Sequence, residues 1–161
     1  MLIGKFFKKV KKECKSHFFS GLSFDSSRCK KNNIFFAIKG NEMNGNNFVD
    51  HAITKGAKTI VSNQRFEGIK KNILYIKSKN VRKSLSSTAY AICSNKPKNL
   101  IAVTGTNGKS SIADFYYQIL RLNKKKVASI GTLGIHTALY KKNVLNTTLD
   151  PIELSLSLIH I

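Results

Sequence analysis

The sequence LIAVTGTNGKSS, residues 100–111, contains the strongest fold signal in the chain. Its apolar start predicts a buried strand over 100–103, and a glycine-bearing turn follows it. Apolar residues at helical spacing then predict a helix over 109–122, and another strand is expected over 127–130. The side chains expected on the buried face of that helix are Ile112, Phe115, Ile119 and Leu122. Strand, turn, helix and strand in this order indicate the start of a βαβ unit, which binds nucleotides where strand meets helix.

The turn carries the residue types of a phosphate-binding loop. Small residues let backbone N–H groups close around phosphate oxygens, and the helix N-terminus adds its positive end. Lys109 would bridge the outer phosphates, and the Ser110 hydroxyl would ligate Mg²⁺. The general pattern GxxxxGK[ST] is only partly met, because Val103 stands where its first glycine belongs.

A plainer interpretation of the same residues is a tight turn at Gly105 and Gly108, with Lys109 solvated at the start of a helix. A lysine in the first turn opposes the helix dipole unless an anion lies there. The expected strand and helix also flank the turn on the correct sides. We therefore favour the phosphate-binding interpretation.

The first part of the chain alternates short apolar runs with helical patterns. The expected elements are a strand over residues 34–38, a helix over 47–55, strands over 57–61 and 73–76, and a helix over 81–93. The residues expected to face inward are Phe48, Ala52 and Ile53 in the first helix, and Val81, Leu85, Ala89, Ile92 and Cys93 in the second. The alternation predicts an α/β arrangement. Because the pattern breaks at Pro97, we expect one domain over residues 1–95 and the start of a second over 96–161.

The charge of the chain has two interpretations. The 161 residues carry a formal net charge of +20, from 28 Lys and Arg against 8 Asp and Glu. Such a field attracts polyanions without any special site, so a basic nucleic-acid-binding module is one alternative. Only four of the basic residues are Arg, the better reader of phosphates and bases, whereas Asn and Ile are abundant. We therefore attribute most of the charge to AT-rich codon usage and expect no specific nucleic-acid partner.

Composition also bears on the cellular setting. Hydrophobic residues make up 42% of the chain, too many for a disordered basic tail. Three cysteines without a CxxC pair argue against a zinc or disulfide scaffold and for a reducing compartment. No apolar run approaches the roughly 20 residues that span a bilayer. Residues 1–19 are expected to form a first helix with its Phe side inward, rather than a basic segment lying on a membrane. We expect a cytoplasmic, monomeric protein.

Three segments of the second half carry a family resemblance. The loop VTGTNGKSS, residues 103–111, resembles the ATP loop of the Mur ligases, the ATP-dependent amide-forming enzymes of peptidoglycan synthesis. Their shorter form, TGTNGK[ST][ST], needs no glycine at the position of Val103. Residues 129–134 (SIGTLG) and 146–151 (NTTLDP) are similar to the GTLG and NTTPDP segments of UDP-N-acetylmuramoyl-tripeptide synthetases, the MurE type, with Leu149 replacing a proline.

The N-terminal half carries a matching block. Residues 24–28 (FDSSR) and 33–40 (NIFFAIKG) are similar to the LDSR and GDLFVAxKG pattern of the same enzymes, with Ser27 at the usual place of arginine. The resemblance covers about residues 20–155. Folylpolyglutamate and cyanophycin-type ligases share the ATP loop and remain an alternative, but the N-terminal block and the NTT segment speak against them.

The resemblance implies roles for the matched positions, with Lys109 catalytic and Ser110 the Mg²⁺ ligand. ATP would be bound by Gly105, Thr106, Asn107, Gly108, Lys109, Ser110 and Ser111. The uridine-nucleotide substrate would be bound by Phe24, Ser26, Asn41, Glu42, Met43, Asn146, Thr147 and Thr148. Without the resemblance, the N-terminal members of this set would be interpreted as turn residues and the two threonines as a helix cap.

The reaction that the resemblance implies is an ATP-dependent amide ligation. The γ-phosphate of ATP passes to the D-Glu carboxylate of UDP-N-acetylmuramoyl-L-alanyl-D-glutamate, and a diamino acid attacks the acyl phosphate. The sequence leaves meso-diaminopimelate and lysine open, and we favour the first. Mur ligases have three domains, so we expect this chain to be an inactive fragment without the C-terminal domain. Apolar surface over residues 100–161 should then be exposed.

Overall fold

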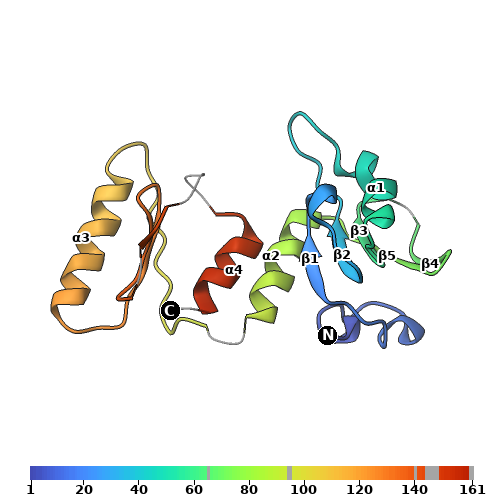
Figure 1. Cartoon of the computed structure of the whole chain (residues 1–161), viewed down its shortest axis with the longest axis horizontal. Coiled ribbons are helices and arrows are strands. Elements are labelled where there is room, and N and C mark those ends of the chain that lie inside the picture. Colours follow the sequence, from blue (N-terminus) through green and yellow to red (C-terminus); the bar gives the residue numbers. More distant parts are fainter. Residues whose placement is uncertain (65, 94–95, 140, 144–148, 160–161) are drawn as a thin grey trace. The chain divides into compact units, whose positions relative to one another are not determined.

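The computed structural model describes residues 1–64, 66–93, 96–139, 141–143 and 149–159, with only the backbone for 158 and 159. It divides into two compact units, an N-terminal unit (Met1–Ala91) and a C-terminal unit (Ile92–Ile161). Figure 1 shows the elements of both units, and each unit is described by itself. Within these residues, no helix is long and apolar enough to cross a membrane.

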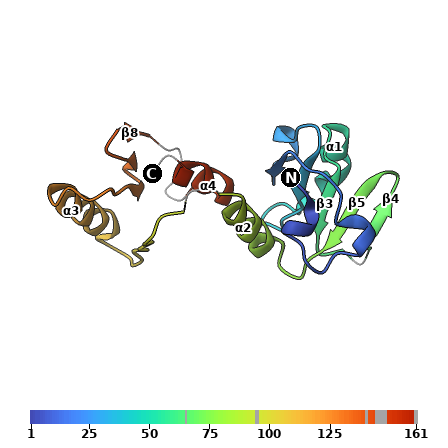
Figure 2. The same ribbon diagram turned by 90° about the horizontal axis from the view of Figure 1, so that it is seen from below.

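The described residues of the N-terminal unit form a five-stranded sheet in the order β1-β2-β3-β5-β4. Its strands are β1 (Gly21–Ser23), β2 (Asn33–Phe36), β3 (Thr59–Ser62), β4 (Gly68–Lys70) and β5 (Ile73–Lys77). Strands β1, β2, β3 and β5 are parallel, and β4 pairs antiparallel with β5 at the edge of the sheet. Figure 2 shows β4 beside β5. The three strands predicted here are confirmed, with ends shifted by at most two residues, and so is the α/β arrangement.

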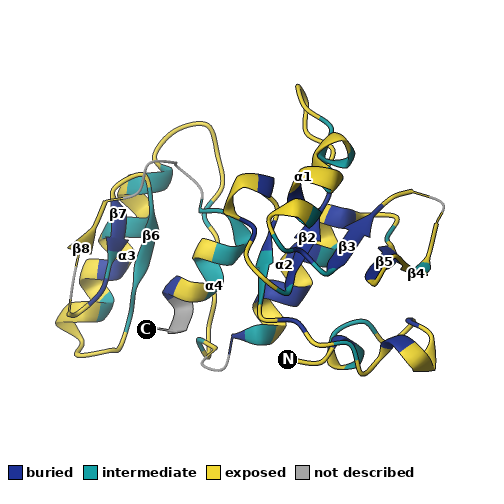
Figure 3. Ribbon diagram, turned by 45° about the vertical axis from the view of Figure 1, so that its right-hand side comes forward, coloured by how far each residue is buried: buried dark blue, intermediate teal, exposed yellow. Residues whose placement is uncertain are grey.

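The core of this unit lies on both faces of the sheet. Ile34, Phe35 and Phe36 of β2 are at most 1% exposed, as expected for a central parallel strand covered on both sides. On one face, Ala52 of α1 (Val49–Thr54) belongs to the same buried cluster as Phe35. In Figure 3 the ribbon of β2 and β3 is accordingly mostly dark blue.

The helix faces of the N-terminal unit match the predicted pattern with one exception. Helix α2 (Val81–Ile92) buries Val81, Leu85, Thr88 and Ala89. The prediction that Phe48 faces inward is wrong, since its side chain is 38% exposed. It ends the 3₁₀ turn η4 (Gly45–Phe48), so it precedes the first turn of α1 instead of belonging to the helix.

The helix predicted over residues 1–19 is also absent. The segment forms two 3₁₀ turns, η1 (Ile3–Lys5) and η2 (Lys12–Cys14), and folds back on itself. The Gly4 N–H donates to the Lys15 carbonyl at 3.0 Å. A Cβ at Gly4 would lie 2.8 Å from the Lys15 Cβ, so glycine permits a close approach that a continuous helix cannot make.

The C-terminal unit combines helices with a small antiparallel sheet. Its elements are α3 (Lys109–Leu122), β6 (Ser129–Gly131), β7 (Gly134–His136), β8 (Lys141–Lys142) and α4 (Pro151–Ile159). Helix α3 has the predicted ends and lies beside β6 (Figure 1). The strand expected over 127–130 is present as β6, but it pairs antiparallel with β7 instead of entering a parallel βαβ unit.

The strand predicted over residues 100–103 is wrong. These residues belong to no strand, and Leu100 and Ile101 are 68% and 60% exposed. A strand needs neighbours that pair with its N–H and C=O groups. The described part of the C-terminal unit offers these residues no such neighbour, so the apolar run remains irregular.

The inward face predicted for α3 is exposed. Ile112, Phe115, Ile119 and Leu122 are between 56% and 82% exposed, and Figure 3 shows long yellow stretches on this helix. The buried side chain is Tyr117, whose hydroxyl donates to the Thr137 carbonyl at 3.0 Å. Helix α3 therefore packs its Tyr117 side on the hairpin formed by β6 and β7. The prediction that apolar surface in residues 100–161 is exposed is confirmed.

Candidate functional site

The glycine turn ends where α3 begins. Gly108 is the N-cap residue of α3 with φ of 74°, and Gly105 has φ of 152°, both in the region that favours glycine. The first N–H groups of a helix have no acceptor within it. Gly108 has no side chain to cap them, and the first turn of α3 contains no acidic residue. These N–H groups are therefore suited to bind a phosphate.

Lys109 folds back over this turn. Its Nζ donates to the carbonyl of Gly105 at 2.5 Å and to that of Thr106 at 3.0 Å. Thr106 and Asn107 are exposed, so the turn is open to solvent. Because a lysine ammonium has three donors, phosphate oxygens can share or replace these carbonyl acceptors.

Ser110 has a partner that sequence reasoning missed. Its Oγ lies 2.6 Å from the Oγ1 of Thr132, 22 residues further along the chain. Thr132 is in the turn between β6 and β7, next to the pair Gly131 and Gly134. The hairpin thus brings a second hydroxyl to the first turn of α3.

The donor set at this turn fits Mg²⁺ only in company with phosphates. Mg²⁺ prefers hard oxygen ligands, and it commonly binds one or two protein oxygens together with water and substrate phosphates. Ser110 and Thr132 offer hydroxyl oxygens. Across the described stretches of chain, no group of three or more His, Cys, Asp or Glu could hold a metal ion. A magnesium ion here would take most of its ligands from a bound nucleotide and water.

The residues matched to uridine binding lie at one edge of the N-terminal sheet. Phe24 and Ser26 follow β1, and residues 41–43 follow β2. Strands β1 and β2 are parallel neighbours, so both segments leave the sheet at the same edge. The carboxyl ends of parallel strands are where open α/β sheets bind ligands. Phe24 and Met43 are 38% and 65% exposed, which leaves their apolar surfaces available there.

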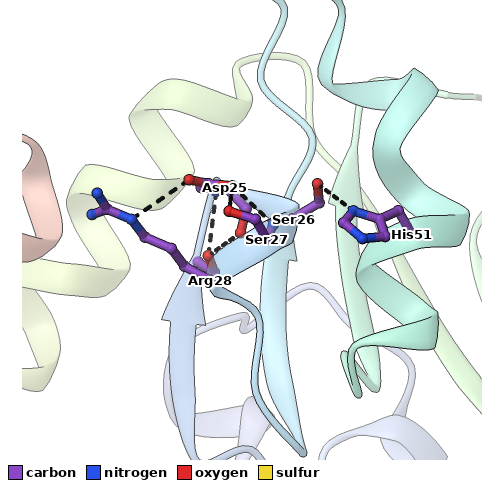
Figure 4. A network of polar contacts seen from close by, with 6 residues as sticks. Asp25, Ser26, Ser27, Arg28 and His51 are labelled. Atoms are coloured by element: carbon purple, nitrogen blue, oxygen red, sulfur yellow. Dashed lines mark hydrogen bonds and ion pairs between the residues drawn. The ribbon is translucent and has the colours of Figure 1, made fainter.

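A network of polar contacts fixes the chain after β1 (Figure 4). Asp25 caps the 3₁₀ turn η3 (Ser26–Arg28), since its Oδ1 accepts from the N–H and the hydroxyl of Ser27 at 2.8 and 2.7 Å. The Nε of Arg28 lies 3.5 Å from Asp25 Oδ2. The hydrogen bond from the Ser27 hydroxyl, helped by the Ser27 N–H and the Arg28 charge and opposed by partial burial, lowers the pKa of Asp25. The cap is therefore ionised at neutral pH.

Ser26 points away from this cap toward α1. It is buried, and its Oγ lies 2.9 Å from Nδ1 of His51, as Figure 4 shows. No local pattern could have indicated His51, because 25 residues separate the two. Nearby, burial raises the pKa of the Cys29 thiol, which favours its protonated form.

The loop after β2 is a tight turn. The Gly40 N–H donates to the Met43 carbonyl at 2.8 Å, which leaves Asn41 and Glu42 exposed at the tip. Asn44 then caps η4 by accepting from the Asn46 N–H at 3.1 Å.

A side-chain hydrogen bond joins two loops at this edge. The amide of Asn46 donates to Asn63 Oδ1 at 3.0 Å, which ties the loop after β2 to the loop after β3. Sequence reasoning assigned neither asparagine, because their contact depends on the sheet order.

The remaining matched positions, Asn146, Thr147 and Thr148, lie outside the described residues. Asp150, directly after them, caps α4: its Oδ1 accepts from the N–H groups of Ile152 and Glu153 at 2.8 and 2.9 Å. Pro151 takes the first helical position, where its missing N–H costs nothing. Asp150 is thus a cap of this helix.

Family models match both units. The model described as Mur ligase family, catalytic domain, matches residues 19–105. The model described as Mur ligase middle domain matches residues 103–161. The two matches meet at the glycine turn.

Relatives of this chain are longer proteins. The UDP-N-acetylmuramoyl-L-alanyl-D-glutamate--2,6-diaminopimelate ligase of Rickettsia prowazekii (strain Madrid E) is 40% identical over 121 residues, which are 75% of this chain and 25% of that protein. The ligase of the same name from Clostridium tetani (strain Massachusetts / E88) is 40% identical over 138 residues, or 83% of this chain and 28% of that one. The chain spans about a quarter of the length of the curated relatives it matches.

Solved structures share the fold. A structure of UDP-N-acetylmuramoyl-L-alanyl-D-glutamate--2,6-diaminopimelate ligase superposes with a TM-score of 0.80 at 23% identity, over 99% of this chain and 33% of that one. The MurF ligase of Thermotoga maritima, solved in complex with ADP, superposes with a TM-score of 0.51 at 23% identity, over 65% of this chain and 24% of that one. The fold and the family models agree across both units, and the chain belongs to the Mur ligase family.

Proposed function

We propose that this chain is part of an ATP-dependent ligase of peptidoglycan precursor synthesis. The reaction adds a diamino acid to UDP-N-acetylmuramoyl-L-alanyl-D-glutamate, and the names of the relatives favour meso-diaminopimelate over lysine. The observation that carries the proposal is the position of Lys109, which starts α3 and holds its ammonium against the glycine turn.

The chemistry depends on activating a carboxylate. An oxygen of the D-Glu carboxylate attacks the γ-phosphorus of ATP and ADP leaves, which converts a poor electrophile into an acyl phosphate. The amine of the diamino acid attacks the acyl carbon, inorganic phosphate leaves and the amide forms. Lys109 would offset the charge on the transferring phosphoryl group, and the N–H groups of α3 would hold the phosphates. The Ser110 hydroxyl would hold a Mg²⁺ ion, which would supply neutralisation of the phosphate charge.

The two units would divide the substrates between them. The N-terminal unit corresponds to a UDP-substrate domain over residues 1–95, with Phe24, Ser26 and residues 41–43 at the uridine end. The C-terminal unit corresponds to the start of an ATP-binding domain over 96–161. Asn146, Thr147 and Thr148 would contact the substrate nearer the dipeptide.

The whole reaction would need more than these residues. The chain spans about a quarter of its relatives, so we propose that the 161 residues alone form no amide. We further propose a cytoplasmic monomer without a specific nucleic-acid partner.

Nucleotide binding tests the assignment of the loop. Titration of the full chain with Mg²⁺ and ATP should detect binding that Lys109→Ala weakens about 10-fold or more, since hydrogen bonds to charged groups contribute roughly 1.5–3 kcal/mol. Lys125→Ala, which removes an exposed lysine beyond α3, is the matched control and should bind as the wild type does. Unchanged ATP affinity in Lys109→Ala would contradict the assignment of the loop. Equal losses of affinity in Lys109→Ala and Lys125→Ala would also contradict it, because they would indicate general charge attraction.

A further inference from the structure

We propose that Thr132 is a positioning residue of the Mg²⁺–nucleotide site, and that its hydroxyl orients Ser110 toward the metal. The inference rests on the function proposed above. It starts from the contact between Ser110 Oγ and Thr132 Oγ1, which at 2.6 Å is a short O–H···O hydrogen bond. Neither the family resemblance nor the relatives assign a role to Thr132.

The hairpin fixes the position of Thr132. The turn at residues 132–133 is closed by the antiparallel pair of Gly131 with Gly134. Gly134 has φ of 101°, and a Cβ there would collide with the Lys142 carbonyl oxygen of β8, so the turn sits tightly on the next strand.

The hairpin is in turn tied to α3. The Tyr117 hydroxyl donates to the Thr137 carbonyl at 3.0 Å, and the Tyr117 ring meets His136 edge-on with centroids 6.1 Å apart. Thr132 and Ser110 therefore belong to two elements that are held together at a second point, two turns further along α3. Their contact is built into the packing of this unit.

The direction of this hydrogen bond matters once a cation binds. A serine hydroxyl that ligates a metal uses a lone pair of its Oγ, so its proton must be donated elsewhere. Thr132 Oγ1 is an acceptor at the correct distance for that proton. With the proton directed to Thr132, a lone pair of Ser110 is held toward the metal instead of sampling other rotamers. Partners that orient a metal ligand in this way commonly change metal affinity about 10–100-fold.

The test compares nucleotide binding with and without magnesium. The affinity of the full chain for ATP is measured in excess Mg²⁺ and in EDTA for the wild type, Thr132→Val and Thr132→Ser. Valine has nearly the shape of threonine and lacks only the hydroxyl. Mg²⁺ should increase the ATP affinity of Thr132→Val about 10-fold less than it increases that of the wild type, while the affinity in EDTA is unchanged. Thr132→Ser should show the same increase as the wild type.

A double variant shows whether the two hydroxyls act together. Ser110→Ala should lose the magnesium gain, and adding Thr132→Val to it should cost nothing further, because both act through one ligand. Thr54→Val, which removes an exposed hydroxyl of α1, is the control and should bind as the wild type does.

Each other outcome has a distinct meaning. A full magnesium gain in Thr132→Val overturns the positioning role. Equal losses in Mg²⁺ and EDTA also overturn it, since they indicate a displaced loop. If the wild type binds no ATP in either condition, the proposed function fails and this inference fails with it.

Discussion

In the N-terminal unit the large apolar side chains of the central strands β2 and β3 are inside, whereas in the C-terminal unit those of the apolar stripe predicted on α3 face solvent. Phe35 and Leu85 are 1% exposed, but Phe115 and Leu122 are 62% and 82% exposed. Both units contain helices with an apolar stripe, yet among the described residues only the helix α2 of the N-terminal unit has this stripe buried, because the sheet of the C-terminal unit packs against Tyr117 on another side of α3. An amphipathic pattern therefore specifies that a face is to be buried, and the presence of a partner decides whether it is.

The largest difference between the units should appear on truncating a phenylalanine. Phe35→Ala removes a ring from the centre of the N-terminal core and should lower the free energy of unfolding of that unit by about 3–5 kcal/mol. The matched change Phe115→Ala on α3 should stay within about 0.5 kcal/mol. Urea denaturation followed by circular dichroism measures both. Similar losses for the two variants would show that the face of α3 is buried in solution.

A smaller loss of stability is expected when the side-chain cap of η3 is removed from the N-terminal unit. Asp25→Ala removes the acceptor of two hydrogen bonds and should cost the N-terminal unit about 1 kcal/mol at pH 7. The folded state lowers the pKa of Asp25, so its stabilisation is complete above the unfolded value near 4 and is lost as pH falls through the folded value. Wild type and variant should therefore converge in acid.

Denaturation midpoints at several pH values between 7 and 2 test this convergence. Asp25→Asn is the control, because it keeps an acceptor oxygen but cannot ionise. A constant gap between wild type and Asp25→Ala down to pH 2 would show that the charge of Asp25 contributes nothing to the cap.

The smallest change in stability is expected on the exposed face of α3. Replacing Ile119 by Ser should alter the free energy of unfolding by less than about 0.5 kcal/mol, since the side chain is already 56% exposed. The same change should reduce self-association at high concentration, because it interrupts an exposed apolar stripe. Analytical ultracentrifugation of both proteins measures this, and an unchanged association would exclude the stripe as its cause.

The comparison also explains how far the sequence could predict the fold. Strands β2, β3 and β5 and helix α2 follow from local apolar patterns, since their partners are present. Helix α3 also has its predicted ends, although its apolar stripe is exposed. The apolar run over 100–103 has the same local pattern, but no strand in the described residues pairs with it. The three-residue strands β1 and β4 are too short to show a period, and the turn at Gly4 depends on a contact with the distant Lys15.

The residues of the candidate site also divide into those that a local pattern predicts and those that depend on contacts distant in sequence. The place of Lys109 and Ser110 at the start of α3 was predictable, because loop and helix are contiguous in sequence. The contacts of Thr132 and His51 could not be predicted. Thr132 lies in the turn between β6 and β7, 22 residues from Ser110. His51 lies in α1, 25 residues from Ser26. The N-terminal positions were found by resemblance alone, and only the parallel pairing of β1 with β2 shows why they share an edge.

The central claim is that the N-terminal unit binds the uridine end of the substrate and the turn before α3 binds ATP, and one nuclear magnetic resonance titration of the full chain tests it directly. UDP-N-acetylmuramoyl-L-alanyl-D-glutamate should shift the amides of Phe24, Ser26 and residues 41–43. Mg²⁺ with ATP should then shift those of Gly105, Gly108 and Ser110. The account would be contradicted if both ligands shifted the same amides, or if neither shifted residues at the carboxyl edge of the N-terminal sheet or at the start of α3.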